Sequence, residues 1–522
     1  MAELLTAAEM RAVERDAIAS GIVTGLELME RAGAGVVDAI FEEWPDLAQG
    51  SHKAVVLCGP GNNGGDGFVV ARLLQQRGWT VTAHLMGEAD RLPPDARTNH
   101  DLWIGMGPCL PLSDGSLGSV KSLPDLVVDA LFGTGLARPV EGDAEFLLGN
   151  LDTLRRDFGV RSVAVDIPSG ICSDSGKALG CFPKVDLTVS FHSEKLGHRL
   201  EQADTHSRRV VVKDIGLHHF DPEDERHDHV WCVEPPAADL LDKPVSGQKY
   251  TQGHALVLTG GAGRTGAARL AAMAALRVGA GLVTLGVPQS AMSEVANQIT
   301  ALMMIKVPDA ETLGELLWDT RLNALCLGPG LGLTDLPRSL IATVLPLRRP
   351  VVLDADALSM FHKTPAELFD MLHEKAVLTP HRGEFARLFP DLDQKLKQEP
   401  QKGPAYSKVD AVRAAARRAG CTVLLKGADT VMAAPDGRCS IHSAQYDRAA
   451  PWLATAGSGD VLSGMITGLM ARGLAPLTAC ETASWLHTQC ALMFGPGLIA
   501  EDIASQIPAV LRDRGIRTPS AG

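Results

Sequence analysis

The stretch GPGNNGGDG at residues 59–67 decides how the first half of this chain folds. It follows the apolar run KAVVLC (53–58) and precedes the helix-like run FVVARLLQQR (68–77). A glycine-rich turn between a strand and a helix is where open α/β sheets bind their ligands. Its glycines let backbone N–H groups converge on a phosphate or another oxyanion, although the pattern is neither G-x-G-x-x-G nor a Walker loop. The stretch therefore predicts a ligand-binding turn, with an ordinary glycine-rich turn as the alternative.

Strand-like and helix-like runs alternate on both sides of this turn, which predicts parallel sheets covered by helices on both faces. We therefore predict an α/β protein with one domain at 1–222 and a second at 223–522. In the first domain the strand-like runs lie at 80–86, 125–133, 161–170, 186–191 and 208–216, with a helical run at 144–159. In the second they lie at 254–260, 281–288, 323–330, 350–358, 376–381 and 421–427, followed by a hairpin at 431–442 and helices from residue 458.

Two polar segments interrupt this pattern. The first, HHFDPEDERHDH (218–229), is rich in His and Asp, which could indicate a metal site. It lacks a fixed ligand spacing, so we interpret it as a solvated hinge between the domains. The second, residues 390–407, is a polar insertion that we interpret either as a lid or as plain surface.

Composition and charge limit the classes of function. The 522 residues are 45% hydrophobic and 21% charged, as in globular proteins, and the net charge of −13 repels nucleic acid and anionic membranes. The ten cysteines are scattered, which is typical of reduced thiols rather than of a disulfide scaffold or a zinc site. Residues 1–17 predict an amphipathic helix rather than a signal peptide. We expect a cytoplasmic homo-oligomer with no nucleic-acid partner and no membrane partner.

Polar side chains follow two further strands of the first domain. Asp129 precedes the loop GTG (133–135), and Asp166 precedes Pro168-Ser169-Gly170. Carboxyl ends of parallel strands meet at one edge of a sheet, so both carboxylates should face the same crevice as the glycine-rich turn. The alternative for each aspartate is a cap or turn residue. The oxygens of Asn62 and Asn63 would suit a hard cation.

The sequence TAGSGD (455–460) is the corresponding feature of the second domain, because it precedes the helix-like run VLSGMITGLMARG. Glycines at a helix N-terminus expose free N–H groups and the positive end of the helix dipole, which together can hold the charge of a phosphoryl group in transfer. Asp460 would then accept a proton from an attacking hydroxyl. The alternative is the capping turn of an ordinary helix.

Four more loops of the second domain end strands or open helices. KGADT (426–430) could embrace nucleotide phosphates with a lysine cation and backbone amides. His381 in TPHRGE (379–384) could serve the site or a purely structural role. The remaining two loops are GPGLG (328–332) and GGAGRTGA (260–267), the latter with a packing turn as a fair alternative.

The first domain resembles the NAD(P)H-hydrate epimerase domain over residues 1–217, through its opening segment, GPGNNGGDG, VDALFGTGL (128–136) and AVDIPSG (164–170). The resemblance implies a Rossmann-like, three-layer fold that interconverts the R and S forms of hydrated nicotinamide nucleotides. It implies that Asp166 faces the reacting ring as the catalytic acid or base, and that potassium is bound by Asn63, Asp129 and Ser169. The hydrate would contact Asn62, Asn63, Gly64, Gly65, Asp66, Gly133, Thr134, Gly135, Leu136, Ala137, Arg138, Pro139 and Asp166.

The second domain resembles the ADP-dependent NAD(P)H-hydrate dehydratase, a member of the ribokinase-like superfamily, over residues 240–515. GPGLG, LDADAL (353–358), TPHRGE, LLKGADT and TAGSGD carry the resemblance. It implies phosphorylation of the hydrate by ADP with Mg²⁺, followed by loss of phosphate, which yields NAD(P)H and AMP. The hydrate would contact Ala267, Gly330, Gly332, His381 and the catalytic Asp460, and the nucleotide would contact Lys426, Gly427, Ala428, Asp429, Thr430 and Gly459.

Two other functions remain as alternatives. The chain could be a vitamin or thiazole kinase of the same superfamily with a non-catalytic N-terminal binding domain. It could also use that domain as a scaffold for protein or RNA, which the acidic charge and the two strand-end aspartates argue against. Neither the preference for NADH or NADPH hydrate nor the choice between ADP and ATP is fixed by the sequence.

Overall fold

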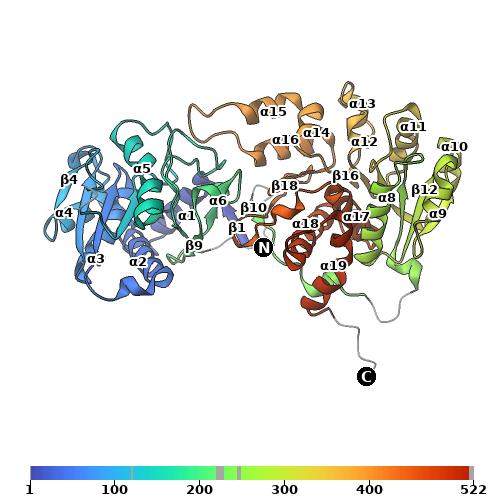
Figure 1. The fold of residues 1–522 in the computed structure, drawn as a ribbon. Helices are drawn as coiled ribbons and strands as arrows, with labels where there is room; N and C mark the ends of the chain where they lie inside the picture. Colours follow the sequence, from blue (N-terminus) through green and yellow to red (C-terminus); the bar gives the residue numbers. More distant parts are fainter. Residues whose placement is uncertain (1, 119–121, 219–228, 244–247, 517–522) are drawn as a thin grey trace. The chain divides into compact units, whose positions relative to one another are not determined.

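The computed structural model describes residues 2–118, 122–218, 229–243 and 248–516, which form two compact units (Figure 1). The first unit contains Ala2–Glu225 together with Glu399–Ser407, and the second contains Arg226–Gln398 and Lys408–Gly522. The predicted domain boundary at 222/223 and most of the predicted hinge lie outside the described residues. Among the described residues, no helix is both long and apolar enough to cross a membrane.

The sheet of the first unit is parallel throughout, with the strand order β4-β3-β2-β5-β6-β7-β9. This confirms the predicted parallel sheet. Its central strand β5 is buried along its whole length, as expected for a strand covered on both faces. The strands are β2 Lys53–Cys58, β3 Thr80–Leu85, β4 Cys109–Pro111, β5 Leu126–Ala130, β6 Arg161–Val165, β7 Leu187–Phe191 and β9 Val210–Lys213.

Helices cover both faces of this sheet. Helices α2, α3 and α4 share one apolar core with it, and helix α5 shares a second core on the opposite face. The alternation of apolar side chains along the inner strands divides them between these two cores. The helices are α1 Ala7–Ala19, α2 Gly25–Glu43, α3 Asn62–Gln76, α4 Pro94–Ile104, α5 Asp143–Phe158 and α6 Ala203–His206.

The N-terminal segment differs from the prediction of a single amphipathic helix. Residues Ala2–Leu5 form strand β1, which pairs in parallel with β8 (Glu194–Lys195). Thr6 then caps helix α1, because its side chain accepts a hydrogen bond from the backbone N–H of Glu9, whose carboxylate bonds back to Thr6. The prediction was wrong for residues 2–5 because burial of the strand overrides the helical pattern, while the capping box sets the true start of the helix.

The sheet of the second unit contains the strand order β13-β12-β11-β14-β15-β16-β17-β18-β19-β10. Among the strands of the described residues, only β18 pairs with its neighbours in the antiparallel sense, which confirms the predicted hairpin of β18 and β19. The strands are β10 Val230–Cys232, β11 His254–Leu258, β12 Leu282–Val287, β13 Met303–Lys306, β14 Leu322–Leu327, β15 Val351–Leu353, β16 Ala376–Leu378, β17 Thr422–Leu425, β18 Asp429–Ala433 and β19 Cys439–Ser443.

A close contact between helices α8 and α17 positions the functional end of the second unit. A Cβ atom on Gly464 would lie 2.1 Å from the carbonyl oxygen of Ala271, and one on Gly468 would lie 2.5 Å from that of Ala275. Glycine therefore lets the two backbones touch. The three C-terminal helices confirm the predicted helical end. These four helices are α8 Gly266–Arg277, α17 Ser458–Ala471, α18 Pro476–Phe494 and α19 Ala500–Asp513.

The polar insertion at 390–407 divides between the two units. Its first part is helix α15 (Pro390–Lys397), with Leu392 and Leu396 buried. Residues 399–407 belong to the first unit, where the backbone N–H of Gly403 donates to the carbonyl oxygen of Ala137. The remaining helices are α7 Ala238–Leu241, α9 Met292–Ala296, α10 Ala310–Leu316, α11 Asp335–Val344, α12 Asp356–Ser359, α13 Pro365–Phe369, α14 Arg382–Leu388 and α16 Lys408–Ala419.

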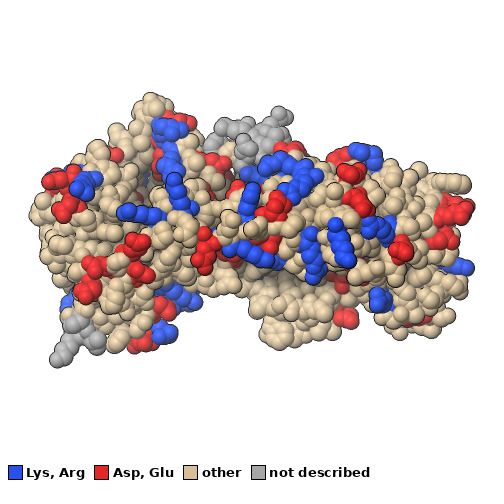
Figure 2. All heavy atoms as spheres, turned by 90° about the horizontal axis from the view of Figure 1, so that it is seen from above, with Lys and Arg blue, Asp and Glu red and all other residues tan. Residues whose placement is uncertain are grey.

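Charged side chains of both signs are mixed on one face of the molecule. Figure 2 shows lysines and arginines interspersed with aspartates and glutamates over the face in view. The net charge of −13 is therefore not concentrated there in one acidic surface.

Candidate active sites

The glycine-rich turn of the first unit lies between β2 and α3, as predicted. Gly61 is the N-cap of α3, and the turn is so tight that a Cβ atom on Gly59 would lie 1.6 Å from the carbonyl oxygen of Leu131. A Cβ atom on Gly64 would lie 2.0 Å from the carbonyl oxygen of Gly59. Glycine is therefore required by close approach of backbone to backbone, which brings the turn against the strand end that carries Asp129.

Gly59→Ala is expected to destabilise the first unit by about 3 kcal/mol, because the new methyl group overlaps a backbone carbonyl that cannot move aside. Gly61→Ala is the matched control, since a Cβ atom there meets nothing within 4 Å. Thermal unfolding of the two variants measures the difference. Equal stability of the two variants would contradict the role that we give to Gly59.

Asp129 and Ser169 form a buried polar pair beside this turn. The hydroxyl of Ser169 donates to Oδ1 of Asp129 at 2.6 Å, and its backbone N–H donates to Oδ2 at 2.9 Å. Both side chains are inaccessible to solvent. Burial raises the pKa of Asp129 to about 6, against the opposing effect of the Ser169 hydrogen bonds. Burial therefore disfavours the ionised form of Asp129, and a bound cation would stabilise that form.

Asn63 and Asp166 converge on Gly133, which begins the neighbouring loop. A Cβ atom on Gly133 would lie 2.9 Å from Oδ1 of Asn63 and 3.4 Å from Oδ2 of Asp166. Asp166 itself has a φ of 66°, a left-handed conformation that is strained for a side chain of this kind. The structure thus brings together the three strand ends that were predicted to share a crevice, while residues 134–139 extend from Gly133 as a partly exposed loop.

Two residues of this site were missed by the sequence reasoning. Nζ of Lys195 lies 2.7 Å from Oδ1 of Asp166, and Lys195 is fully buried. Glu14 of helix α1 also faces Asp166: burial and the charge of Asp166 raise the pKa of Glu14. Neither residue belongs to a glycine-rich motif, so no local pattern signals them.

The TAGSGD turn of the second unit opens helix α17, as predicted. Gly457 has a φ of 88° and is the N-cap, and Asp460 lies in the first turn of the helix. Burial raises the pKa of Asp460 to about 7; the carboxylates of Asp354, Asp356 and Glu384 add to the increase, and Lys426 opposes it. A carboxylate with this pKa can exchange a proton near neutral pH, which suits a general base.

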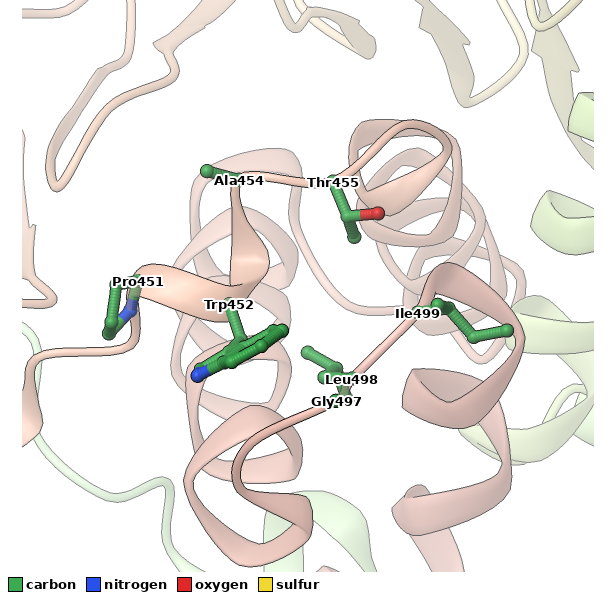
Figure 3. Close-up of a pocket in the computed structure, with 7 residues that line it drawn as sticks. All are labelled: Pro451, Trp452, Ala454, Thr455, Gly497, Leu498 and Ile499. Atoms are coloured by element: carbon green, nitrogen blue, oxygen red, sulfur yellow. The ribbon is translucent and has the colours of Figure 1, made fainter.

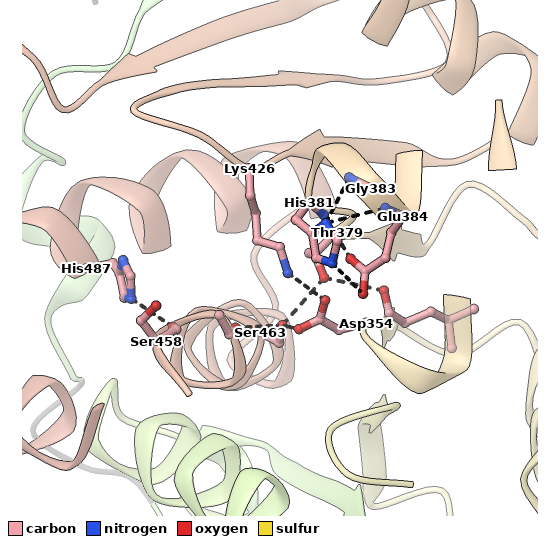
Figure 4. Close-up of polar contacts among 11 residues, drawn as sticks. Asp354, Thr379, His381, Gly383, Glu384, Lys426, Ser458, Ser463 and His487 are labelled. Atoms are coloured by element: carbon pink, nitrogen blue, oxygen red, sulfur yellow. Dashed lines mark hydrogen bonds and ion pairs between the residues drawn. The ribbon is translucent and has the colours of Figure 1, made fainter. Parts of the chain in front are cut away.

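Asp354 links two other polar residues of this site, Lys426 and Ser463, through hydrogen bonds (Figure 4). It lies just beyond strand β15, where its Oδ1 accepts a hydrogen bond from Nζ of Lys426 at 2.8 Å and its Oδ2 accepts one from Oγ of Ser463 at 2.5 Å. Asp354 is 1% exposed. The sequence reasoning assigned no role to Asp354 or Ser463, although Asp354 belongs to the LDADAL motif.

His381 and Glu384 form the start of helix α14. Nδ1 of His381 accepts hydrogen bonds from the backbone N–H groups of Gly383 and Glu384, at 2.9 and 3.4 Å, and the backbone N–H of His381 donates to Oε2 of Glu384 at 2.8 Å. Figure 4 shows the side chains of His381 and Glu384 in the same group of polar residues as Lys426 and Asp354. His381 therefore has a structural capping role, and its exposed side chain places Nε2 3.5 Å from Oε1 of the buried Glu384.

The predicted nucleotide loop places Lys426 next to the helix end. A Cβ atom on Gly459 would lie 3.3 Å from Nζ of Lys426. Thr430 closes the loop by donating from its hydroxyl to the carbonyl oxygen of Gly427 at 2.7 Å. Oδ1 of Asp429 accepts a hydrogen bond from Nζ of Lys408, also at 2.7 Å. The Asp429 side chain therefore holds the loop in place through Lys408.

The predicted hydrate contacts Ala267, Gly330 and Gly332 lie close together in the second unit. A Cβ atom on Gly330 would lie 3.6 Å from the Cβ of Ala267. The backbone N–H of Gly332 donates to Oδ2 of Asp356 at 2.8 Å, and Asp356 is one of the carboxylates that act on Asp460. These residues therefore lie in the same part of the second unit as Asp460.

A pocket of about 350 Å³ opens directly before the TAGSGD turn (Figure 3). The ring of Trp452 faces Leu498 across it, and Trp452 is 49% exposed. The sequence reasoning missed this pocket because its two walls come from segments more than forty positions apart. Its lining residues are Pro451, Trp452, Ala454, Thr455, Gly497, Leu498 and Ile499.

The fold and these sites define a two-domain α/β enzyme with a glycine-lined ligand turn in each unit. A family model described as YjeF-related protein N-terminus matches residues 25–197, and one described as NAD(P)H-hydrate dehydratase matches residues 255–507. The bifunctional NAD(P)H-hydrate repair enzyme Nnr of Moorella thermoacetica is 34% identical over 98% of this chain and 97% of its own length. The chain belongs to the family of bifunctional NAD(P)H-hydrate repair enzymes, with an epimerase domain and a dehydratase domain.

Two further relatives match one domain each. The NAD(P)H-hydrate epimerase of Rhodobacter capsulatus is 51% identical over 42% of this chain and all of its own. The ADP/ATP-dependent NAD(P)H-hydrate dehydratase of Bacillus subtilis, co-crystallised with ATP and Mg²⁺, is 26% identical over 52% of this chain and 94% of its own, with a TM-score of 0.42. The predicted family and the predicted α/β fold class are confirmed.

Proposed function

We propose that the first unit interconverts the R and S hydrates of NADH and NADPH, and that the second dehydrates the S hydrate with ADP to give NAD(P)H, AMP and phosphate. One observation carries the proposal: a relative that matches this chain from end to end is named for both activities. The kinase alternative is weaker, because the epimerase match covers the N-terminal unit that it leaves without a reaction.

In the proposed dehydration, Asp460 takes the proton of the hydrate's hydroxyl as the oxygen attacks the terminal phosphorus of ADP and AMP leaves. The N–H groups of residues 457–459 at the end of α17 face the phosphoryl group, and Lys426 binds the nucleotide phosphates. The C–O bond then breaks with loss of phosphate, a much better leaving group than hydroxide. A proton leaves the adjacent ring carbon to water, which restores the double bond of the reduced nicotinamide ring. The hydrogen bonds of Asp354 to Lys426 and to Ser463 of α17 hold Lys426 beside the N-terminus of that helix.

The dehydration rate is expected to rise with pH through about 7. Asp460 must be ionised to accept the proton, and its pKa is raised to about 7, so the base form is lost as the pH falls below that value. The charged groups that face Asp460 are Lys426 and the carboxylates of Asp354, Asp356 and Glu384. A profile of kcat against pH with saturating hydrate and nucleotide measures this. A rate that stays constant from about pH 5 to about pH 9 would show that Asp460 is not the base.

In the proposed epimerisation, a proton reaches the hydroxyl at the hydrated ring carbon, water departs, and an iminium cation remains. Water can then return to either face of the ring, and its proton returns to the enzyme. Asp166 faces the position next to Gly133 from which it could act on the ring. The strained backbone of Asp166 supports this assignment, because such strain persists mainly where function requires the side chain's direction.

Potassium fits the first unit. Asn63, Asp129 and Ser169 supply amide, carboxylate and hydroxyl oxygens, and Asp129 and Ser169 are inaccessible to solvent. These residues would hold the ion, which would offset the buried negative charge of Asp129. In the second unit, Mg²⁺ would lie mainly on the nucleotide phosphates; no group of three His, Cys, Asp or Glu among the described residues has the arrangement of a metal site.

The full chain, given a mixture of R and S hydrates, tests the proposal. With ADP, complete recovery of the absorbance of reduced nicotinamide is expected, together with one AMP per nucleotide restored. Parallel reactions with ATP, with and without K⁺, define the phosphate donor and the ion. Recovery of the S fraction alone would remove the epimerase assignment, and accumulation of a stable phosphorylated product would favour the kinase alternative.

A further inference from the structure

The segment 399–407 belongs to the first unit, although it stands between helices α15 and α16 of the second unit in the sequence. Gln401, Lys402 and Pro404 are exposed, whereas Ala405 is 8% exposed. The segment therefore packs against the first unit around Ala405. The reactions proposed above give this contact no role.

The backbone of Gly403 contacts the loop 133–139, which is predicted to bind the hydrate. Its N–H donates to the carbonyl oxygen of Ala137 at 3.1 Å, and a Cβ atom on Gly403 would lie 2.5 Å from the carbonyl oxygen of Leu136. In the part of the chain that the structure describes, this is the one backbone hydrogen bond that joins residues 134–139 to another segment. The middle of the loop is therefore held by a residue from the second half of the chain.

The neighbouring Ala405 contacts the loop 166–172, which begins with Asp166. The backbone N–H of Ala405 donates to Sγ of Cys172 at 3.3 Å. Ala405, Cys172 and Leu179 also form a small apolar cluster, and Leu136 of the other loop packs against it. Cys172 and Leu179 are 2% and 0% exposed, so the contact is closed to water. The segment therefore touches both loops that carry the predicted hydrate contacts.

The two loops differ in how much support they receive from the rest of the unit. Asp166 has contacts of its own: its backbone N–H donates to the carbonyl oxygen of Val189 at 2.8 Å, and its Oδ1 lies 2.7 Å from Nζ of the buried Lys195. The loop 133–139 lies outside the helices and strands and is partly exposed. A ligand binds more tightly to a loop that is ordered before the ligand arrives, because less conformational entropy is lost on binding. The contact with residues 403–405 should therefore strengthen hydrate binding and leave the reaction step largely unchanged.

We propose that residues 403–405, which lie in the dehydratase half of the sequence, are part of the epimerase site and hold the loop 133–139 in the conformation that binds the hydrate. Gly403 and Ala405 are positioning residues, since they act through the loop rather than on the substrate. The inference rests on the proposed epimerisation, and it makes hydrate binding in the first unit depend on a segment outside the first 225 residues.

Gly403→Ala in the full chain tests the contact with the loop, because the new methyl group would press on the carbonyl oxygen of Leu136, a backbone atom. The KM for hydrate in epimerisation should rise about tenfold, with kcat nearly unchanged. Dehydration of pure S hydrate by the same chain should keep its parent KM and kcat. Gly115→Ala is the matched control: Gly115 is an exposed glycine of the same unit, where the nearest neighbour of a Cβ atom, Oγ of Ser113, would lie at 3.9 Å. It should leave both activities at their parent values.

Ala405→Arg tests the contact with the second loop, because a long charged side chain cannot enter the cluster of Cys172 and Leu179. It should raise the same KM. Ala405→Ser keeps the size of the side chain and the backbone N–H that donates to Cys172, and it should restore parent behaviour. A loss of kcat without a rise in KM, in Gly403→Ala and Ala405→Arg alike, would overturn the proposal, since it would show damage to the fold rather than loss of loop positioning.

Hydrogen exchange of the ligand-free chains measures the loop itself, without any activity. The amides of residues 134–138 should exchange about tenfold faster in Gly403→Ala and Ala405→Arg than in the parent chain, while those of strands β5 and β6 stay protected. Parent-like exchange of these amides in both variants would overturn the role of residues 403–405. If the parent chain does not accelerate epimerisation, the proposed function fails, whereas faster exchange in the variants would still support the positioning of the loop.

Discussion

Asp460→Asn is expected to abolish dehydration while the same chain continues to epimerise its substrate. The amide cannot accept the proton of the attacking hydroxyl, and loss of a positioned general base lowers kcat by about 10²–10⁴-fold. The change keeps the shape of the side chain in the first turn of α17, so the binding of both ligands should change little. Restoration of reduced nicotinamide from pure S hydrate and ADP measures the effect on dehydration, and exchange between R and S hydrates measures epimerisation.

Asp335→Asn is the control for this result. Asp335 also lies in the first turn of a helix of the second unit, α11, but at an exposed position outside the site. It should dehydrate at the parent rate. If Asp460→Asn also kept the parent rate, Asp460 could not be the base, and Asp354 would have to be reconsidered.

Asp166→Asn is expected to abolish epimerisation while leaving dehydration intact. The variant loses the negative charge that faces the ring at Gly133, and about a 10²–10⁴-fold loss of rate is expected whether Asp166 acts as acid, base or stabilising anion. A mixture of R and S hydrates with ADP should then restore only the S fraction quickly, followed by a slow phase set by spontaneous epimerisation. The amplitude of the fast phase is the measurement.

Asp143→Asn is a suitable control because Asp143 begins helix α5 of the same unit at an exposed position. It should restore the whole mixture in one fast phase. The same behaviour in Asp166→Asn would exclude Asp166 from the reaction.

Local features of this fold could be predicted from sequence because they depend on neighbouring residues. The turn after β2 is specified by glycines whose missing Cβ atoms make room for Leu131, and the hairpin of β18 and β19 has its turn residues between two apolar runs. The N-terminal segment was predicted wrongly because Leu4 and Leu5 take their structure from a partner strand at Glu194–Lys195, which no local pattern reveals.

The sites show the same limit. Asp129, Asp166 and Asp460 could be predicted as candidates because each stands at a strand or helix end with glycines beside it. Lys195 was not found, since its partner Asp166 lies in a different strand–loop segment and only the fold brings the two together. Asp354 escaped notice for a related reason: its importance comes from Lys426 and Ser463, which are 72 and 109 positions away.

Residues 399–407 belong to the first unit although they lie far from it in the sequence, and this limits how the two halves of the gene can be exchanged. A single cut near residue 225 cannot release two complete units, because the N-terminal piece would lack the segment whose Gly403 N–H binds the carbonyl oxygen of Ala137. Exchange of either half by one recombination event would therefore combine residues 136–137 of one ancestor with residues 399–407 of another. Substitutions at residues 136–137 should therefore be accompanied by substitutions at residues 399–407 during evolution.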